Sequence, residues 1–490
     1  MAPRIEKQRV ERAGAKTTEC APDGRGRYVR APARRPCQRR SGELKALSLA
    51  LLLGVPLMQG CQADAARQAP ASGAATEESG GAGGAAGNAS AESASAETSS
   101  SAGGAGENAP AEGSPAERES FAQWLDEFTA YAQRQGIASA TLESALSDLA
   151  YQPRIIELDR YQPEFTRAIW TYLDSAVSDT RIENGREKLA AHRASAERAE
   201  MRYGVPPAIL TAIWGVESNY GSNFGSFRTL EALATLGYEG RRHEFAREQL
   251  LAALRIIEQG DIAPEEMRGS WAGAMGHTQF IPTSFLAYAV DGDGDGRRDI
   301  WGSIDDVMAS TAHYLEANGW RRGERWGMEV QLPADFDYAL TGLATRDASA
   351  EWRARGVRSA SGEPLASLEG ASVIAPAGAR GPAFLVGHNF RVIMRYNNAT
   401  SYALAVALLA DRIDGQPGVA AEWPRDLEPL SRSQTRELQQ ALNRLGFDAG
   451  TPDGIMGPNT RSALRLWQRD RGETPDGFAS VELLERLQRQ

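Results

Sequence analysis

Residues 206–221 carry a single carboxylate, Glu217, on an otherwise apolar stretch. Two prolines open the stretch, apolar residues recur at helical spacing, and Gly221 offers a stop, so the pattern predicts one short buried helix. On that helix Glu217 shares a face with Ile213 and Trp214. Burial and the negative end of the helix dipole would both raise the pKa of the carboxyl. Glu217 is therefore a candidate general acid, and the alternative is a solvated glutamate or one paired with an arginine.

A second stretch, residues 269–285, combines small residues with polar ones. Its glycines and alanines allow close backbone approach. Ser270, Thr278 and Gln279 supply groups suited to recognising hydroxyls and amides. We interpret this stretch as a wall of a binding cleft. His277 is interpreted as a hydrogen-bonded packing residue rather than a base, because it stands alone among small residues.

A candidate metal loop follows directly. Aspartates occupy its positions 1, 3 and 5 and a glycine occupies position 6: Asp291, Asp293, Asp295 and Gly296. This is the first half of a calcium loop, in which hard oxygen ligands converge on one cation. Position 12 is Gly302 instead of a glutamate, so closure needs Asp305 or Asp306 from the following helix. A turn without metal is the alternative, although three aspartates at alternate positions repel one another without a cation.

Beyond residue 320 the pattern changes to short apolar runs that predict strands among loops. Three polar-tipped residues, Tyr396, Asn397 and Tyr402, gather at an expected strand-to-helix junction, where sites commonly lie. From about residue 431, two or three short helices around a glycine turn predict a small separate module. The fold class is therefore mainly α, with a small mixed α/β region.

Composition narrows the functional classes. The net charge is −10, and no sustained basic run occurs after residue 40, so we expect no nucleic-acid partner. The three cysteines all lie in the first 61 residues. The folded part therefore has no thiol for disulfide, zinc or cysteine chemistry.

The first 117 residues predict export and a tether. An apolar run over residues 44–58 is too short to span a bilayer and suits a signal-peptide core. Gly60 before Cys61 resembles the lipobox of bacterial lipoproteins, in which the cysteine is acylated; a cleaved signal with an incidental cysteine is the alternative. We expect residues 1–61 to be the signal region. Residues 62–117 are rich in Ala, Gly, Ser and Glu and should form a disordered tether.

Several motifs together resemble the membrane-bound lytic murein transglycosylase B family over roughly residues 118–415. They include residues 213–221 (Ile-Trp-Gly-Val-Glu-Ser-Asn-Tyr-Gly), residues 272–276 (Ala-Gly-Ala-Met-Gly), the aspartate loop and residues 395–397 (Arg-Tyr-Asn). Residues 431–490 resemble the peptidoglycan-binding domain of many wall-lytic enzymes. Residues 416–430 would then be a linker.

The resemblance implies a lysozyme-like helical core in which Glu217 is the single acid/base. It implies that the substrate is bound around Glu217 by Ser270, Gln279, Tyr396, Asn397 and Tyr402. It also implies a calcium loop completed by Asp305. We expect structural Ca²⁺ on Asp291, Asp293, Asp295, Asp305 and the Arg297 carbonyl, and no organic cofactor. The sequence departs from the family at His277, where glutamine or tyrosine is frequent.

One glutamate has a mechanistic consequence. Glycosidases usually need two carboxylates, but the next acid along the chain is Glu231. In a transglycosylase the substrate's N-acetyl group and six-position hydroxyl supply the rest, which gives a 1,6-anhydromuramyl end. The expected partner is peptidoglycan glycan, in the periplasm, with a lipid anchor in the outer membrane. A hydrolytic muramidase and a non-catalytic wall-binding lipoprotein are the alternatives.

Overall fold

The computed structural model describes residues 114–161 and 167–489. The predicted signal region, Cys61 and nearly all of the predicted tether lie outside these residues. Within the described ranges, no helix is both long and apolar enough to cross a bilayer.

The described chain begins with a helix that packs aromatic rings along one face. Helix α2 (Pro115–Arg134) starts at a capping box formed by Ser114 and Glu117. Its Trp124 stacks on Phe121 and Phe128, with ring centroids 6.0 and 5.5 Å away. The helices that follow are α3 (Ser139–Leu146), α4 (Pro153–Arg160), α5 (Ile169–Ala176), α6 (Asp179–Ala191) and α7 (Arg193–Tyr203).

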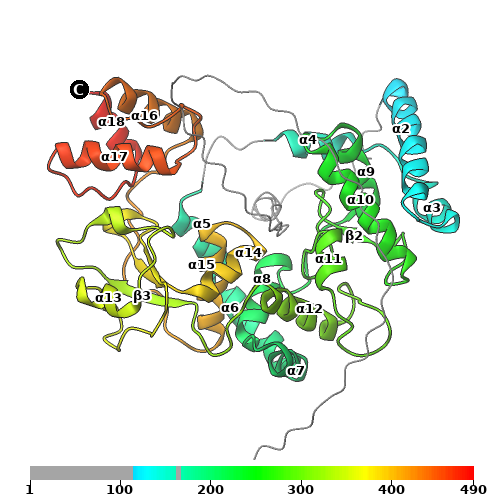
Figure 1. Ribbon diagram of the computed structural model, residues 1–490, viewed down its shortest axis with the longest axis horizontal. Coiled ribbons are helices and arrows are strands. Elements are labelled where there is room, and N and C mark those ends of the chain that lie inside the picture. The colour runs from blue at the N-terminus through cyan, green and yellow to red at the C-terminus, as the bar shows by residue number, and fades with distance from the viewer. Residues whose placement is uncertain (1–113, 162–166, 490) are drawn as a thin grey trace, which may run out of the picture. The chain divides into compact units, whose positions relative to one another are not determined.

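Helix α8 (Pro207–Ser218) lies at the centre of the helical core (Figure 1). Pro207 occupies its first turn, where a missing amide proton costs nothing. The helix ends at Asn219, which adopts a left-handed conformation with φ of 47°, slightly before the stop expected at Gly221. Eight of its twelve residues are buried, because α6, α7 and later helices pack around it, while Glu217 is partly exposed. The predicted buried helix is therefore present.

Some of the later helices of the core pack against α8, and the others pack against one another. Their bounds are α9 (Thr229–Glu239), α10 (His243–Glu258), α11 (Pro282–Tyr288), α12 (Ile304–Ala317), α14 (His388–Tyr396) and α15 (Thr400–Ile413). Helices α12 and α15 both pack against α8. A two-stranded antiparallel ribbon of β1 (Phe227–Arg228) and β2 (Arg268–Gly269) precedes the small-residue stretch.

A small mixed region is inserted between α12 and α14. It contains an antiparallel sheet in the order β4-β3-β6-β5, with β3 (Gly327–Gln331), β4 (Arg358–Ser359), β5 (Ser372–Ile374) and β6 (Ala383–Val386). Helix α13 (Ser349–Ala354) and the 3₁₀ turns η2 (Tyr338–Leu340) and η3 (Gly378–Arg380) accompany the sheet. The region has its own apolar core around Trp352, which is fully buried. The short strands predicted from apolar runs are thus present.

One predicted element differs. Tyr396 and Asn397 were expected at a strand-to-helix junction, but the residues before them form α14, so they lie at a junction between two helices. Phe390, Ile393 and Tyr396 recur every three residues and are all buried, which is a helical repeat. A strand would have buried alternate residues instead.

The C-terminal module consists of α16 (Arg432–Arg444), α17 (Pro458–Asp470) and α18 (Val481–Gln488), as expected for three short helices. Trp467 lies at the centre of its separate apolar core. The segment that leads to it, residues 416–430, packs on the preceding helical domain and its inserted sheet. The ring of Trp423 lies 6.4 Å from that of Trp170, and the amides of Ala420 and Ala421 donate to the Glu329 carboxylate.

Candidate active site

Glu217 lies in the last turn of α8, where α15 crosses it. The Tyr402 hydroxyl, on α15, donates a hydrogen bond of 2.6 Å to Glu217 Oε1. Tyr402 is itself only 3% exposed, so its position is fixed by packing. The contact therefore holds one oxygen of the carboxyl and leaves Oε2 to carry a proton.

The environment of Glu217 favours the protonated acid. Burial raises the pKa of its carboxyl to about 8, although the hydrogen bond from Tyr402 acts in the opposite direction. A group with this pKa carries a proton at neutral pH and can donate it. Helix α8 thus holds a carboxylic acid in the state that a general acid needs.

No second carboxylate acts on Glu217 within the described residues. Burial and the Tyr402 bond are the influences on its pKa, and no neighbouring acid contributes. A partner at the separation found in glycosidase pairs would repel the ionised form and would add to that shift. Glu231, the next acid in sequence, pairs with Arg228 at 3.0 Å instead.

Tyrosine rings connect this carboxyl to the small-residue stretch. Tyr396 stacks on Tyr402 with ring centroids 6.5 Å apart, and its hydroxyl donates to the carbonyl of Thr278 at 2.6 Å. Tyr396 is fully buried. The junction between α14 and α15 and the loop at 276–279 are thereby held on the same side of Glu217.

The other three expected binding residues keep unused polar groups. Gln279 donates from Nε2 to the carbonyls of Phe224 and Gly276, at 3.0 and 2.9 Å, and its Oε1 has no donor among the described residues. Ser270 Oγ accepts from the Ala274 amide at 3.1 Å, which leaves its hydroxyl proton available. The Asn397 side chain forms no hydrogen bond within the described chain, and no direct bond joins Ser270 or Asn397 to Glu217.

Backbone strain is concentrated at this site. Within the described residues, the non-glycine residues with positive φ are Asn219, Tyr220 and Gln279. Two of them directly follow the Glu217-Ser218 pair, and the third is an expected binding residue. Such conformations are costly and persist where the surroundings enforce them, often at functional sites. Sequence reasoning did not find this feature.

His277 is held by packing and hydrogen bonds, in agreement with its interpretation as a packing residue. Its ring stacks on Trp214 at 5.8 Å, and Trp214 Nε1 donates to its Nδ1 at 3.0 Å. That bond places the ring proton of the neutral tautomer on Nε2. Burial lowers the pKa of His277. Gly221 has φ of 80° and leaves no room for a Cβ beside the ring, so glycine is required there.

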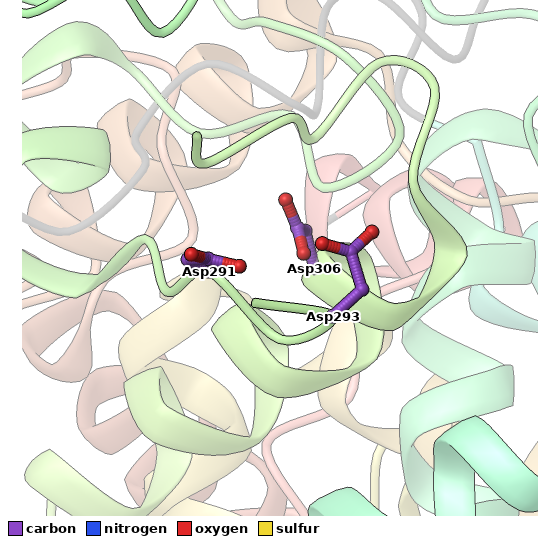
Figure 2. A group of neighbouring side chains, drawn as sticks. All are labelled: Asp291, Asp293 and Asp306. Atoms are coloured by element: carbon purple, nitrogen blue, oxygen red, sulfur yellow. The ribbon is translucent and has the colours of Figure 1, made fainter. Parts of the chain in front are cut away.

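The aspartate loop brings carboxylates together, but the group differs from the expected set. Asp291, Asp293 and Asp306 offer oxygens within 4.8 Å of one another, and Figure 2 shows Asp306 rising from the helix that follows the loop. Clustered carboxylate oxygens are the donors that Ca²⁺ prefers. Asp306 also accepts from the amides of Gly292 and Asp299, which ties it to both ends of the loop.

Two expected ligands, Asp295 and Asp305, lie outside this group. Asp305 forms an ion pair with Arg198 of α7 instead of joining the cluster. Asp295 accepts from the Arg297 amide at 2.8 Å and stays outside the group of three. Adjacent residues of a helix point about 100° apart, so the rotation of α12 decides which aspartate faces the loop.

The family profile described as "Transglycosylase SLT domain" matches residues 120–411, more than half of the chain. The chain belongs to this family. A second profile, "Putative peptidoglycan binding domain", matches residues 431–487. Among curated relatives, membrane-bound lytic murein transglycosylase B of Escherichia coli (strain K12) is 33% identical over 244 residues, which span 49% of this chain and 66% of that protein, just under two thirds of its length.

Solved structures agree with this family. SltB3 from Pseudomonas aeruginosa, in complex with NAG-anhNAM-pentapeptide, is 50% identical with a TM-score of 0.73, covering 75% of this chain and 99% of that one. The Escherichia coli lytic transglycosylase Slt35, in complex with calcium, is 30% identical with a TM-score of 0.53, covering 62% and 95%. The SLT transglycosylase described here therefore has the expected lysozyme-like helical fold, and its catalytic domain is that of a peptidoglycan lytic transglycosylase.

Proposed function

We propose that Glu217 carries both proton transfers of a non-hydrolytic cleavage of the MurNAc-GlcNAc β-1,4 bond. The observation that supports this most is a Tyr402-anchored acid of pKa about 8 without a second carboxylate among the described residues. Glu217 first donates its proton to the glycosidic oxygen, and the bond to the anomeric carbon breaks. The substrate's N-acetyl oxygen stabilises the positive charge that develops on that carbon.

The resulting carboxylate then accepts the proton of the substrate's own six-position hydroxyl. That oxygen attacks the anomeric carbon and displaces the acetamido oxygen, which closes a 1,6-anhydro ring and returns Glu217 to its acid form. No water is consumed. Ser270, Gln279 and Asn397 are proposed to bind the sugar through their unused polar groups, while Tyr396 and Tyr402 hold the acid and the cleft wall.

The test combines a variant with product chemistry. Glu217→Gln keeps the size of the side chain but has no transferable proton, so turnover of purified sacculi should fall by about 10²–10⁴-fold or more. Glu231→Gln is the matched control and should retain activity. Mass spectrometry of the parent's products should find ends lighter by one water than reducing ends. Reducing ends would indicate a muramidase, and full activity in Glu217→Gln would remove this residue from the mechanism.

We propose calcium as a structural cofactor of the aspartate loop. The carboxylate cluster supports this, as does the related lytic transglycosylase whose structure is in complex with calcium. Asp291 and Asp293 are the proposed ligands from the loop, with Asp306 replacing the expected Asp305 as the acid from α12. When bound, the ion supplies positive charge that offsets carboxylate repulsion and holds the loop to the helix.

We propose that the protein works in the cell envelope, exported and anchored through an acylated Cys61. The membrane-bound relative and the lipobox-like end of the signal region support this. The residue after the cysteine is Gln62, not aspartate, which favours the outer membrane. Cys61→Ser should release the protein from the membrane fraction. Unchanged fractionation would contradict the anchor.

A further inference from the structure

A cavity of about 620 Å³ lies beside α8, next to the catalytic residue but separate from the groups that hold it. Trp214, one helical turn before Glu217, forms part of its wall, and residues 219–222, which directly follow the catalytic turn, form another part. Lys188 and His192, from the end of α6, and His277 also line the cavity. Its volume falls in the range of small-ligand sites, about 300–1,000 Å³.

Lys188 is unusual in this chain. It is the single lysine after Lys45, although arginines are frequent throughout. Its Nζ lies 5.8 Å from the centre of the Trp214 ring, and the side chain is exposed. No described carboxylate forms a salt bridge with it. An unpaired, flexible ammonium at the rim of a cavity can bind an incoming carboxylate as a point charge.

The other groups in the cavity are polar and suit a peptide more than a bare anion. His277 has its Nδ1 occupied by Trp214, so its neutral ring presents an N–H on Nε2. Asn219 and Ser222 add amide and hydroxyl groups. Glu187 also lines the cavity, so one negative charge accompanies the positive one. A peptide could use its amides to bind the donors and acceptors of the cavity and its carboxylate to bind the Lys188 ammonium.

We propose that this cavity receives the peptide stem of the glycan substrate and that Lys188 binds a carboxylate of the stem. The inference rests on the proposed function, because it assumes a peptidoglycan strand at Glu217. Two related structures are complexes with disaccharides that carry a pentapeptide, which supports substrates of this chemistry. Because Trp214 is one turn from Glu217, a stem on a sugar next to the cleaved bond reaches the cavity without a long span.

The experiment compares stem-bearing glycan with glycan stripped of its peptides by an amidase. Lys188→Met keeps much of the apolar stem and removes the charge. It should lower kcat/KM on stem-bearing glycan by about ten-fold, mainly through KM, because a charge-assisted hydrogen bond is lost. On stripped glycan the change should stay within about two-fold. Lys188→Arg should restore most of the loss, since it retains the charge.

Each other outcome has a defined meaning. Arg193→Met removes an exposed charge outside the cavity and should behave as the parent on both substrates. An equal loss on both substrates, or no loss on stem-bearing glycan, overturns the proposal. A larger loss on stripped glycan would assign Lys188 to the lactyl carboxylate that the amidase exposes, which also overturns it. Failure of the proposed function is distinct, because the parent would then release reducing ends from either substrate.

Discussion

A single hydrogen bond and a buried setting define the chemistry available to Glu217. The carboxyl is held by Tyr402 at 2.6 Å, and burial keeps it protonated at neutral pH. The same burial has a thermodynamic cost, because the unfolded chain ionises this group at its ordinary pKa of 4.5. The residue that we propose as the acid/base therefore reduces the stability of the fold, as is common at active sites.

This trade predicts a pH-dependent effect of Glu217→Gln on stability. Below pH 4.5 Glu217 is protonated in both the folded and the unfolded chain, so its contribution to the free energy of unfolding is fully present. Between 4.5 and about 8 the unfolded chain gains stability by ionising while the folded chain does not, so the contribution is lost as pH rises. The variant lacks this loss. Its Tm should exceed the parent's by roughly a few degrees at pH 8 and by less at pH 5.

Calorimetry at several pH values checks this, with the exposed Glu248→Gln as the control for removal of a carboxylate. The control should show no advantage that grows with pH. A Tm difference between Glu217→Gln and the parent that stays constant from pH 5 to pH 8 would contradict the raised pKa.

Tyr402→Phe should move the alkaline limit of activity to higher pH. The Tyr402 hydrogen bond lowers the pKa of Glu217, so its removal lets burial raise that pKa further. Turnover at the optimum should fall by about ten-fold, because the carboxyl loses its anchor. The pH profile of kcat/KM on soluble glycan reports the free enzyme. Tyr161→Phe, which removes the hydroxyl of an exposed tyrosine outside the site, is the control, and a shift toward lower pH in Tyr402→Phe would exclude this role.

At the scale of elements, residue spacing predicted what depends on local sequence. The two prolines and the spacing of apolar residues predicted α8 and the helix face on which Glu217 lies. Short apolar runs predicted three of the strands. The choice between Asp305 and Asp306 depends instead on how α12 packs, which buries Asp306 and leaves Asp305 partly exposed. The helical form of residues 389–396 likewise depends on tertiary packing, since β-branched and aromatic residues there also suit a strand.

The aspartate loop, with its proposed calcium, gives a prediction at this scale. Calcium should raise the Tm of the parent, because an ion that binds only the folded state at 100 times its Kd adds about 2.7 kcal/mol of stability. Asp306→Asn should reduce this calcium-dependent increment, and Asp305→Asn should retain it, since Asp305 pairs with Arg198. The measurement compares the rise in Tm that calcium causes in each variant, not the Tm itself. Asp306 also holds the loop through two backbone amides, so its replacement lowers the Tm even without metal. The reverse pattern would restore Asp305 as the ligand, and no response to calcium or chelator would remove the site.

At the scale of the whole molecule, the predicted linker is part of the catalytic domain's surface. All described residues belong to one compact unit of the chain. The ring centroid of Phe478, in the C-terminal module, lies 6.5 Å from that of Trp170. The Arg425 guanidinium forms a salt bridge of 2.6 Å with the Asp174 carboxylate. The Ala379 amide donates to Asp476 of the module at 2.9 Å. A truncation at residue 415 would therefore uncover apolar surface, and one at residue 430 keeps Trp423 in place.

We expect a chain ending at Leu430 to cleave soluble glycan fragments at a rate within about three-fold of the parent, since the residues around Glu217 remain. Its binding to sacculi should weaken by at least ten-fold, because a linked binding module turns the second contact into an intramolecular one. Phe478→Ala, which keeps the module but weakens its contact with Trp170, is the matched control and should bind sacculi as the parent does. Cosedimentation with purified sacculi measures both. If the shortened chain sediments as strongly as the parent, residues 431–490 do not carry wall binding, and if Phe478→Ala binds as weakly as the shortened chain, docking and not the module itself supplies the affinity.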